Sequence, residues 1–261
     1  MTAKYRHIIF DADHTLIDFQ KDERRAFRAA FADMPPTKAD KAPSIADMPP
    51  SKTQRAAIAG MPSTQEEFAV QMQAYSARNW EELGLNNVND PLIRKEYHRR
   101  TYVHVHALFE YAQREYGLSN AAQAERTFYQ TLCSPSLPID GALEIVKELS
   151  QRYAVSVATN GLSDMQNARL VNFKPCLHRL FISEEMGTIK PAEEFGEMML
   201  DSLQARAEEC LFVGDSLSSD MALAGKLNMD AIWYNPDGRT LPEGYRIKAQ
   251  IRTLQELFKY I

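Results

Sequence analysis

Short apolar runs recur near the start of the chain and throughout its second half. They are Ile8–Phe10, Tyr153–Ala158, Leu180–Ile182, Cys210–Val213 and Ala231–Tyr234. Runs this short, without polar alternation, are typical of strands buried on both faces of a parallel sheet. Helical patterns such as Leu143–Leu149 separate them. The alternation predicts an α/β fold, with a Rossmann-like, doubly wound parallel sheet as its core.

The pattern changes in the middle of the chain, where strand-like runs disappear and long helical patterns replace them. We therefore expect the α/β core domain to comprise residues 1–18 and 138–261. An inserted α-helical cap domain would comprise residues 19–137.

Two helix boundaries in this middle region can be predicted. Ser63 with Glu66 has the spacing of a capping box, which predicts a helix that ends near Gly84. Asp90, followed by proline, predicts the start of a second helix that ends near Gly117.

A short imperfect repeat lies within the expected cap. Ala32–Pro36 (ADMPP) returns as Ala46–Pro50 and, more loosely, as Ala59–Ser63 (AGMPS). Its proline density is incompatible with a regular helix or a central strand. One interpretation is an expanded, solvated Pro-rich loop over about residues 33–62. The other is an arm that frames an active-site entrance or contacts a second subunit in a homodimer.

Charge and composition exclude some classes of partner. Hydrophobic residues make up 44% of the chain and charged residues 25%, which is ordinary globular composition. The net charge of −5 gives no broad attraction for a polyanion. We therefore expect no nucleic acid polymer as a partner.

The sequence favours a cytoplasmic protein that has no membrane partner. No segment reaches the ~18 apolar residues of a membrane span, and the first ten residues lack the pattern of a signal peptide. Cys133, Cys176 and Cys210 are widely spaced and contain no C-x-x-C pair. This spacing suggests neither a disulfide framework nor a zinc site, so a reducing compartment is expected.

Acidic residues follow two of the predicted strands. Asp11 and Asp13 come directly after the first strand, and Asp215 follows the run that ends at Val213. The carboxyl ends of parallel strands form the ligand crevice of such sheets, so these side chains should converge. Carboxylates buried together need a neutralising cation, and Mg²⁺ suits oxygen ligands.

Four short motifs in the sequence resemble those of the haloacid dehalogenase (HAD) superfamily of hydrolases. They occur in the superfamily's order, each after a predicted strand or before a helix. They are Asp11-x-Asp13-x-Thr15, Thr159-Asn160-Gly161, Lys190-Pro191 and Gly214-Asp215 with Asp220. Each motif alone is weak, but the four together are specific.

The resemblance implies a reaction. Asp11 would attack phosphorus and form an aspartyl-phosphate. Asp13 would protonate the leaving group and then activate water. Lys190 would neutralise charge on the phosphoryl group and the nucleophile.

The resemblance also implies two binding sets. The residues that would bind the substrate phosphate are Thr159, Asn160, Gly161 and Lys190. The residues that would hold Mg²⁺ are Asp11, Asp13 (through its main-chain carbonyl), Asp215 and Asp220.

Longer segments narrow the resemblance. Phe10–Phe19, Ser183–Pro191 and Gly214–Asp220 are similar to bacterial house-cleaning pyrimidine 5′-nucleotidases, which have a helical cap. The resemblance implies that the partner is a small phosphorylated metabolite, namely a nucleoside 5′-monophosphate. Because cap residues mainly select the substrate, the residues that would recognise the base cannot be named from these segments.

Other functions fit part of the pattern. A phosphatase of phosphoglycolate or a sugar phosphate, or a phosphosugar mutase, would use the same core residues. A haloacid dehalogenase shares the aspartate nucleophile, but Asp13 argues against it because those enzymes resemble a pattern without the second acid. A noncatalytic protein that binds a phosphate ligand could retain the fold, although the intact motif set argues against it.

Three histidines of the expected cap are candidates for a metal site. They are His98, His104 and His106. The last two are two residues apart, which does not place them on one face of a helix. We therefore expect no metal site there.

Overall fold

The computed structural model describes residues 4–34 and 62–261 of the 261-residue chain. The Pro-rich repeat lies almost entirely outside these residues, so its two interpretations stay predictions. The chain divides into two compact units. A core unit contains Met1–Phe19, Asn87–His98 and Cys133–Ile261, and a helical unit contains Gln20–Asn86 and Arg99–Leu132. Phe19 and the stretches 87–98 and 133–137, which we expected in the cap, belong to the core unit.

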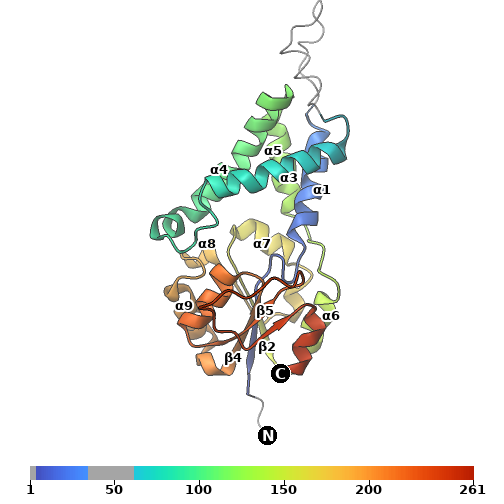
Figure 1. The fold of residues 1–261 in the computed structure, drawn as a ribbon. Coiled ribbons are helices and arrows are strands. Elements are labelled where there is room, and N and C mark those ends of the chain that lie inside the picture. The colour runs from blue at the N-terminus through green and yellow to red at the C-terminus, as the bar shows by residue number, and fades with distance from the viewer. Residues whose placement is uncertain (1–3, 35–61) are drawn as a thin grey trace, which may run out of the picture. The chain divides into compact units, whose positions relative to one another are not determined.

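The core unit is built on one parallel sheet, as the apolar runs predicted (Figure 1). Its strands are β1 (His7–Phe10), β2 (Ala154–Thr159), β3 (Arg179–Ile182), β4 (Cys210–Gly214), β5 (Asp230–Tyr234) and β6 (Ala249–Ile251). Their order is β3-β2-β1-β4-β5-β6, the doubly wound order, which confirms the predicted fold class. Phe10 is level with Val157 of β2 and with Val213 of β4. The residues that follow these three strands therefore emerge at the same edge.

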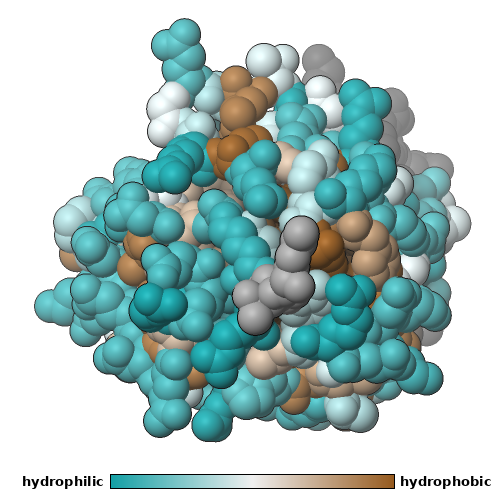
Figure 2. Space-filling view, turned by 90° about the horizontal axis from the view of Figure 1, so that it is seen from below, coloured by the Kyte–Doolittle hydropathy of each residue, from teal (hydrophilic) through white to brown (hydrophobic). Residues whose placement is uncertain are grey.

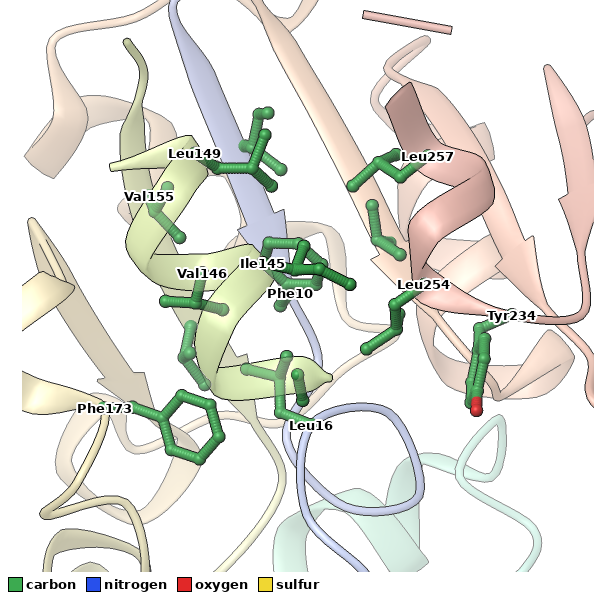
Figure 3. Close-up of a cluster of buried hydrophobic side chains, with 14 of the residues drawn as sticks. Phe10, Leu16, Ile145, Val146, Leu149, Val155, Phe173, Tyr234, Leu254 and Leu257 are labelled. Atoms are coloured by element: carbon green, nitrogen blue, oxygen red, sulfur yellow. The ribbon is translucent and has the colours of Figure 1, made fainter. Parts of the chain in front are cut away.

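Helices cover both faces of this sheet. They are α6 (Ala142–Leu149), α7 (Ser163–Arg169), α8 (Ser183–Met186), α9 (Glu193–Leu203) and α10 (Ala222–Lys226), with the short turns η2 (Lys174–Cys176), η3 (Ala207–Glu209), η4 (Leu217–Met221) and η5 (Leu254–Lys259). On one face, α6 and η5 pack on the strands through side chains such as Ile145 and Leu254 (Figure 3). On the other face, α9 and α10 pack through Phe195 and Leu223.

The two-sided burial explains why the strands read as continuous apolar runs. Ile8 and Phe10 point to the face with α6, whereas Ile9 points to the face with α9, and all three are fully buried. Each such side chain contributes roughly 1.5–3 kcal/mol relative to exposure. On the face of the core unit at the end where β1 begins, hydrophobic residues form small separate areas among hydrophilic ones (Figure 2).

The helical unit contains α1 (Phe19–Phe31, from Gln20 onward), α3 (Gln65–Glu82), the larger part of α4 (Pro91–Tyr116) and α5 (Ala121–Leu132). The centre of the unit is aromatic. Phe27 of α1 lies 4.6 Å, ring centroid to centroid, from Phe128 of α5 and 6.3 Å from Phe68 of α3. These contacts give the unit an apolar core of its own. The second predicted helix is confirmed as α4, which starts at Pro91 and ends just before Gly117.

The predicted capping box is displaced by one residue. The N-cap of α3 is Thr64, whose hydroxyl accepts a hydrogen bond of 3.1 Å from the main-chain N–H of Glu67. The Glu67 carboxylate accepts hydrogen bonds from the N–H and hydroxyl of Ser63. The prediction of Ser63 with Glu66 was therefore wrong in register, and Glu66 instead pairs with Arg28. The predicted end of this helix near Gly84 is confirmed, because α3 ends at Glu82.

Within the described ranges 4–34 and 62–261, no helix combines the length and the apolar character that crossing a bilayer requires.

Candidate active site

Three carboxylates meet where β1 and β4 end. Asp11 follows β1 directly, and its main-chain N–H donates to the carbonyl of Val213 in β4. Asp215 follows β4, and Asp220 returns to the strand end from the η4 turn. One carboxylate oxygen of each of the three acids lies within 4.8 Å of the others. The structure thus brings together the acids that the sequence motifs suggested.

Lys190 contacts two acids of this cluster. Its ammonium donates to Asp11 Oδ1 at 2.6 Å, to Asp220 Oδ1 at 2.8 Å and to the carbonyl oxygen of Ala158 at 2.6 Å. The side chain is 1% exposed. Burial alone would lower the pKa of the Lys190 ammonium, but the two carboxylates outweigh burial and raise it. The lysine is therefore held in its charged form beside Asp11.

One ammonium does not neutralise three carboxylates. Burial, together with Asp220 and Asp215, raises the pKa of Asp11 well above its ordinary value despite the nearby Lys190. Burial and Asp220 raise the pKa of Asp215 to about 7. Both shifts mean that further negative charge is unfavourable here. The donor set, three carboxylates with an excess of negative charge, fits a hard divalent cation such as Mg²⁺.

The carboxylate of Asp13 lies in a different environment. It forms an ion pair of 2.6 Å with Arg169 and accepts a hydrogen bond of 2.9 Å from Gln166. Burial would raise the pKa of Asp13, but Arg169 and Gln166 outweigh it and lower the pKa. The surroundings thus raise the pKa of Asp11 and lower that of Asp13, the two aspartates of the first motif. The metal role of Asp13 concerns its main-chain carbonyl and stays a prediction.

A tight turn follows Asp13. His14 has a positive φ of 63°, and the N–H of Leu16 donates to the carbonyl of Ala12. The Thr15 side chain is fully buried, and the described residues offer its hydroxyl no hydrogen-bond partner. The imidazole of His14 is exposed.

The residues of the predicted phosphate loop lie beside the acids, but they are already hydrogen-bonded. The hydroxyl of Thr159 accepts a 2.6 Å bond from Gln166. The side-chain amide of Asn160 exchanges two hydrogen bonds with the main chain of Lys190. The N–H of Gly161 donates to the hydroxyl of Ser183 at 3.0 Å. Phosphate binding by these three residues stays a prediction.

Two glycines of the site face side chains that come back toward them from the following helical turn. A Cβ on Gly214 would lie 2.3 Å from Asp220 Oδ2, and a Cβ on Gly161 would lie 2.8 Å from Cγ of Gln166. Contacts below 3.0 Å require the neighbour to move. Glycine at these positions therefore lets Asp220 and Gln166 reach the site.

Sequence reasoning did not place four residues of the core unit next to the site, and it considered His98 only for a metal site in the expected cap. The four are Gln166, Arg169, Ser183 and His98. His98, on the part of α4 that belongs to the core unit, lies with its Nε2 2.8 Å from the hydroxyl of Ser183. For Gln166 and Arg169 a signal existed, because a spacing of three places both on one face of a helix. For His98, 85 residues from Ser183, the sequence offered none.

The parallel sheet, with acids and a buried lysine at its strand ends, defines the class of this protein. The chain belongs to the haloacid dehalogenase-like hydrolase family, whose model matches residues 5–227. The HAD resemblance of the sequence motifs is therefore confirmed.

Individual relatives are similar over most of the chain. The HAD-hydrolase YfnB of Bacillus subtilis is 28% identical over 98% of this chain and 94% of its own length. A crystal structure of YfnB bound to magnesium matches with a TM-score of 0.68 at 25% identity, covering 98% of each chain. Pyrimidine 5′-nucleotidase PynA of Streptococcus pneumoniae is 28% identical over 89% of this chain and 84% of its own.

The fold is shared with enzymes of another activity. The L-2-haloacid dehalogenase RSc1362 has a TM-score of 0.69 over 99% of both chains, at 15% identity. This likeness shows the fold alone, so the chemistry has to be argued from the site.

Proposed function

We propose that this protein is a Mg²⁺-dependent phosphomonoester hydrolase that acts through an aspartyl-phosphate intermediate. The observation that carries the proposal is the group of three carboxylates, from Asp11, Asp215 and Asp220, with Lys190 bonded to the first and the last. A phosphate dianion approaching Asp11 is repelled by these carboxylates, and both Mg²⁺ and the Lys190 ammonium are needed to offset that repulsion.

The residues of the chain divide the reaction into two displacements. The Asp11 carboxylate attacks phosphorus, and the bond to the leaving oxygen breaks as Asp13 gives that oxygen a proton. Asp13 then takes a proton from water, which attacks the phosphorus of the aspartyl-phosphate and frees Asp11 and inorganic phosphate. Lys190 keeps the nucleophile oriented throughout, through its bond to Asp11 Oδ1.

Mg²⁺, when bound, would be held by Asp11, Asp215, Asp220 and the main-chain carbonyl of Asp13, and would offset the charge on the phosphoryl oxygens. Thr159, the main-chain N–H groups of Asn160 and Gly161, and Lys190 would bind those oxygens. The Gly161 N–H would then exchange its bond to Ser183 for the phosphate, and the Lys190 ammonium would exchange one of its three bonds. The crystal structure of YfnB with magnesium supports the metal assignment.

The substrate we propose is a pyrimidine nucleoside 5′-monophosphate, hydrolysed in the cytoplasm. The similarity to the pyrimidine 5′-nucleotidase PynA over 89% of this chain supports this choice. It agrees with the negative net charge, which favours a small metabolite over a nucleic acid polymer.

A substrate panel tests the proposal. Values of kcat/KM are measured with Mg²⁺ for UMP, dUMP and dTMP, and for phosphoglycolate, hexose phosphates and purine monophosphates. Chloride release from an L-2-haloacid is measured in parallel. We expect the pyrimidine nucleotides to be best. A lead of another phosphate by more than about tenfold, or ~1.4 kcal/mol of transition-state discrimination, would refute the nucleotidase assignment. Chloride release without phosphate release would refute the phosphatase.

A further inference from the structure

We propose that Arg169 and Gln166, both on α7, are positioning residues that hold the Asp13 carboxylate for proton transfer. The inference rests on the proposed role of Asp13 as acid and base. The phosphatase motifs place Asp13 but name nothing that holds its side chain. The structure shows a partner on each of its two oxygens.

The guanidinium of Arg169 is fixed on several sides. One terminal nitrogen pairs with Asp13 Oδ1 at 2.6 Å, and the other donates to Gln166 Oε1 at 2.8 Å. Its Nε donates to the hydroxyl of Ser136 at 3.0 Å, and the group lies 5.1 Å from the ring centre of Phe19. The side chain is 1% exposed. A buried guanidinium needs an anionic partner, so it stays with Asp13.

Gln166 holds the second oxygen. Its Nε2 donates to Asp13 Oδ2 at 2.9 Å and to the hydroxyl of Thr159 at 2.6 Å. The same amide therefore joins the acid–base residue to the predicted phosphate loop. Gly161 leaves the space that the Gln166 side chain occupies.

The held orientation matters because proton transfer depends on geometry. A general acid has to lie within about 2.6–3.2 Å of the oxygen that it protonates. A carboxylate that loses one of two partners can rotate away, and small misplacements are costly in rate. The loss should be largest for substrates whose leaving group cannot depart without a proton.

Two esters separate the positioning role from a general structural role. The 5′-oxygen of a nucleotide is a poor leaving group that needs protonation, whereas p-nitrophenolate leaves readily without it. The constant kcat/KM covers only the steps up to the aspartyl-phosphate, so it isolates the first proton transfer. It is measured on UMP and on p-nitrophenyl phosphate for wild type, Arg169→Met, Arg169→Lys and Gln166→Met. Thermal melts confirm folding.

The expected pattern is selective. Arg169→Met and Gln166→Met should lose at least about tenfold more kcat/KM on UMP than on p-nitrophenyl phosphate. Arg169→Lys should recover part of the difference, because its ammonium can again pair with Asp13 Oδ1 and hold that carboxylate in place. Ser136→Ala is the matched control, since it removes a contact of Arg169 but none of Asp13, and both esters should change by the same factor.

Several outcomes would overturn the inference. Equal losses on both esters in folded Arg169→Met and Gln166→Met would show a structural role only. If Arg169→Met does not fold, Gln166→Met and Arg169→Lys decide, and equal effects on both esters in these two variants refute the proposal. If the wild type hydrolyses neither UMP nor p-nitrophenyl phosphate, the proposed function itself is refuted.

Discussion

The core unit and the helical unit both bury polar side chains, but they use them differently. In the core unit, one buried ammonium bonds to Asp11 and Asp220 of a cluster that also contains Asp215, so negative charge remains at the strand ends. In the helical unit, Ser76 donates to Glu23 at 2.6 Å and its hydroxyl lies 3.1 Å from Nε2 of His104. These helical-unit groups bond to one another.

The second network is closed by His104. Its Nδ1 lies 2.8 Å from Asn79 Oδ1, and its ring meets Trp80 edge to face at 5.2 Å. Each of these buried groups has a partner, so they specify packing. The three carboxylates of the core unit, in contrast, outnumber the one ammonium beside them. Their remaining negative charge is available to bind a cation and, with it, a substrate. The difference separates buried polarity that stabilises from buried polarity that reacts.

The largest effect should come from Asp11→Asn. Loss of the nucleophile should lower kcat by roughly 10³-fold or more. The melting temperature should stay level or rise, because one of three mutually repelling carboxylates is removed. Phosphate release and thermal melts measure the two effects. Measurable turnover near the wild-type rate would contradict the covalent mechanism.

Chelation should be the next most damaging change. Exhaustive treatment with EDTA should abolish phosphate release, and added Mg²⁺ should restore it. Asp215→Asn should weaken Mg²⁺ binding, measured by calorimetry, because one carboxylate of the cluster is lost. The matched variant is His104→Gln, in the helical unit, which should bind Mg²⁺ as wild type does. Full activity after chelation would contradict the metal assignment.

Acid should destabilise the protein through His104. Burial lowers the pKa of His104 to about 4 from an ordinary 6.5. Between these values the unfolded chain binds the proton and the folded protein does not, so stability is lost as pH falls. From pH 7 to 5 the loss is about 2 kcal/mol.

The measurement is urea unfolding at both pH values, in wild type and in His104→Gln. The glutamine retains an amide for hydrogen bonding but does not titrate. The variant should lack this part of the pH dependence. Identical pH dependence in both proteins would show that His104 titrates normally in the folded state.

The smallest effect should come from Thr64→Ala at the start of α3. Loss of the N-cap should cost about 1 kcal/mol of unfolding free energy. Since the change lies in the helical unit, kcat should remain at the wild-type value. Urea unfolding measures the loss of stability, and phosphate release measures kcat. A lower kcat in the folded variant would contradict the expectation that this cap acts on stability alone.

The sequence predicted the strands because burial on both faces leaves continuous apolar runs. It missed β6, since Ala249–Ile251 is short and contains Gln250. The start of α3 was misplaced by one residue because Ser63 and Thr64 are both good caps, and two glutamates follow at matching distances. Only the structure distinguishes them.

The site was predictable where a motif is local and lost where contacts are long-range. Asp11 and Asp13 could be recognised from the sequence because they directly follow the apolar run of a buried strand. The partner of Asp13, Gln166, is 153 residues away, and no pattern along the chain joins the two. Pairings of this kind come from the register of β1 against β2, which no local pattern along the chain reveals.

Gly161 and Gly214 carry no functional group, yet a Cβ at these positions would collide with the side chains of Gln166 and Asp220, respectively. In a saturation-mutagenesis library scored by activity, these two codons should therefore tolerate as little variation as the catalytic codons. A ranking of positions by side-chain chemistry would overlook them. An engineer who changes the substrate range of this scaffold should leave both glycines out of the randomised set.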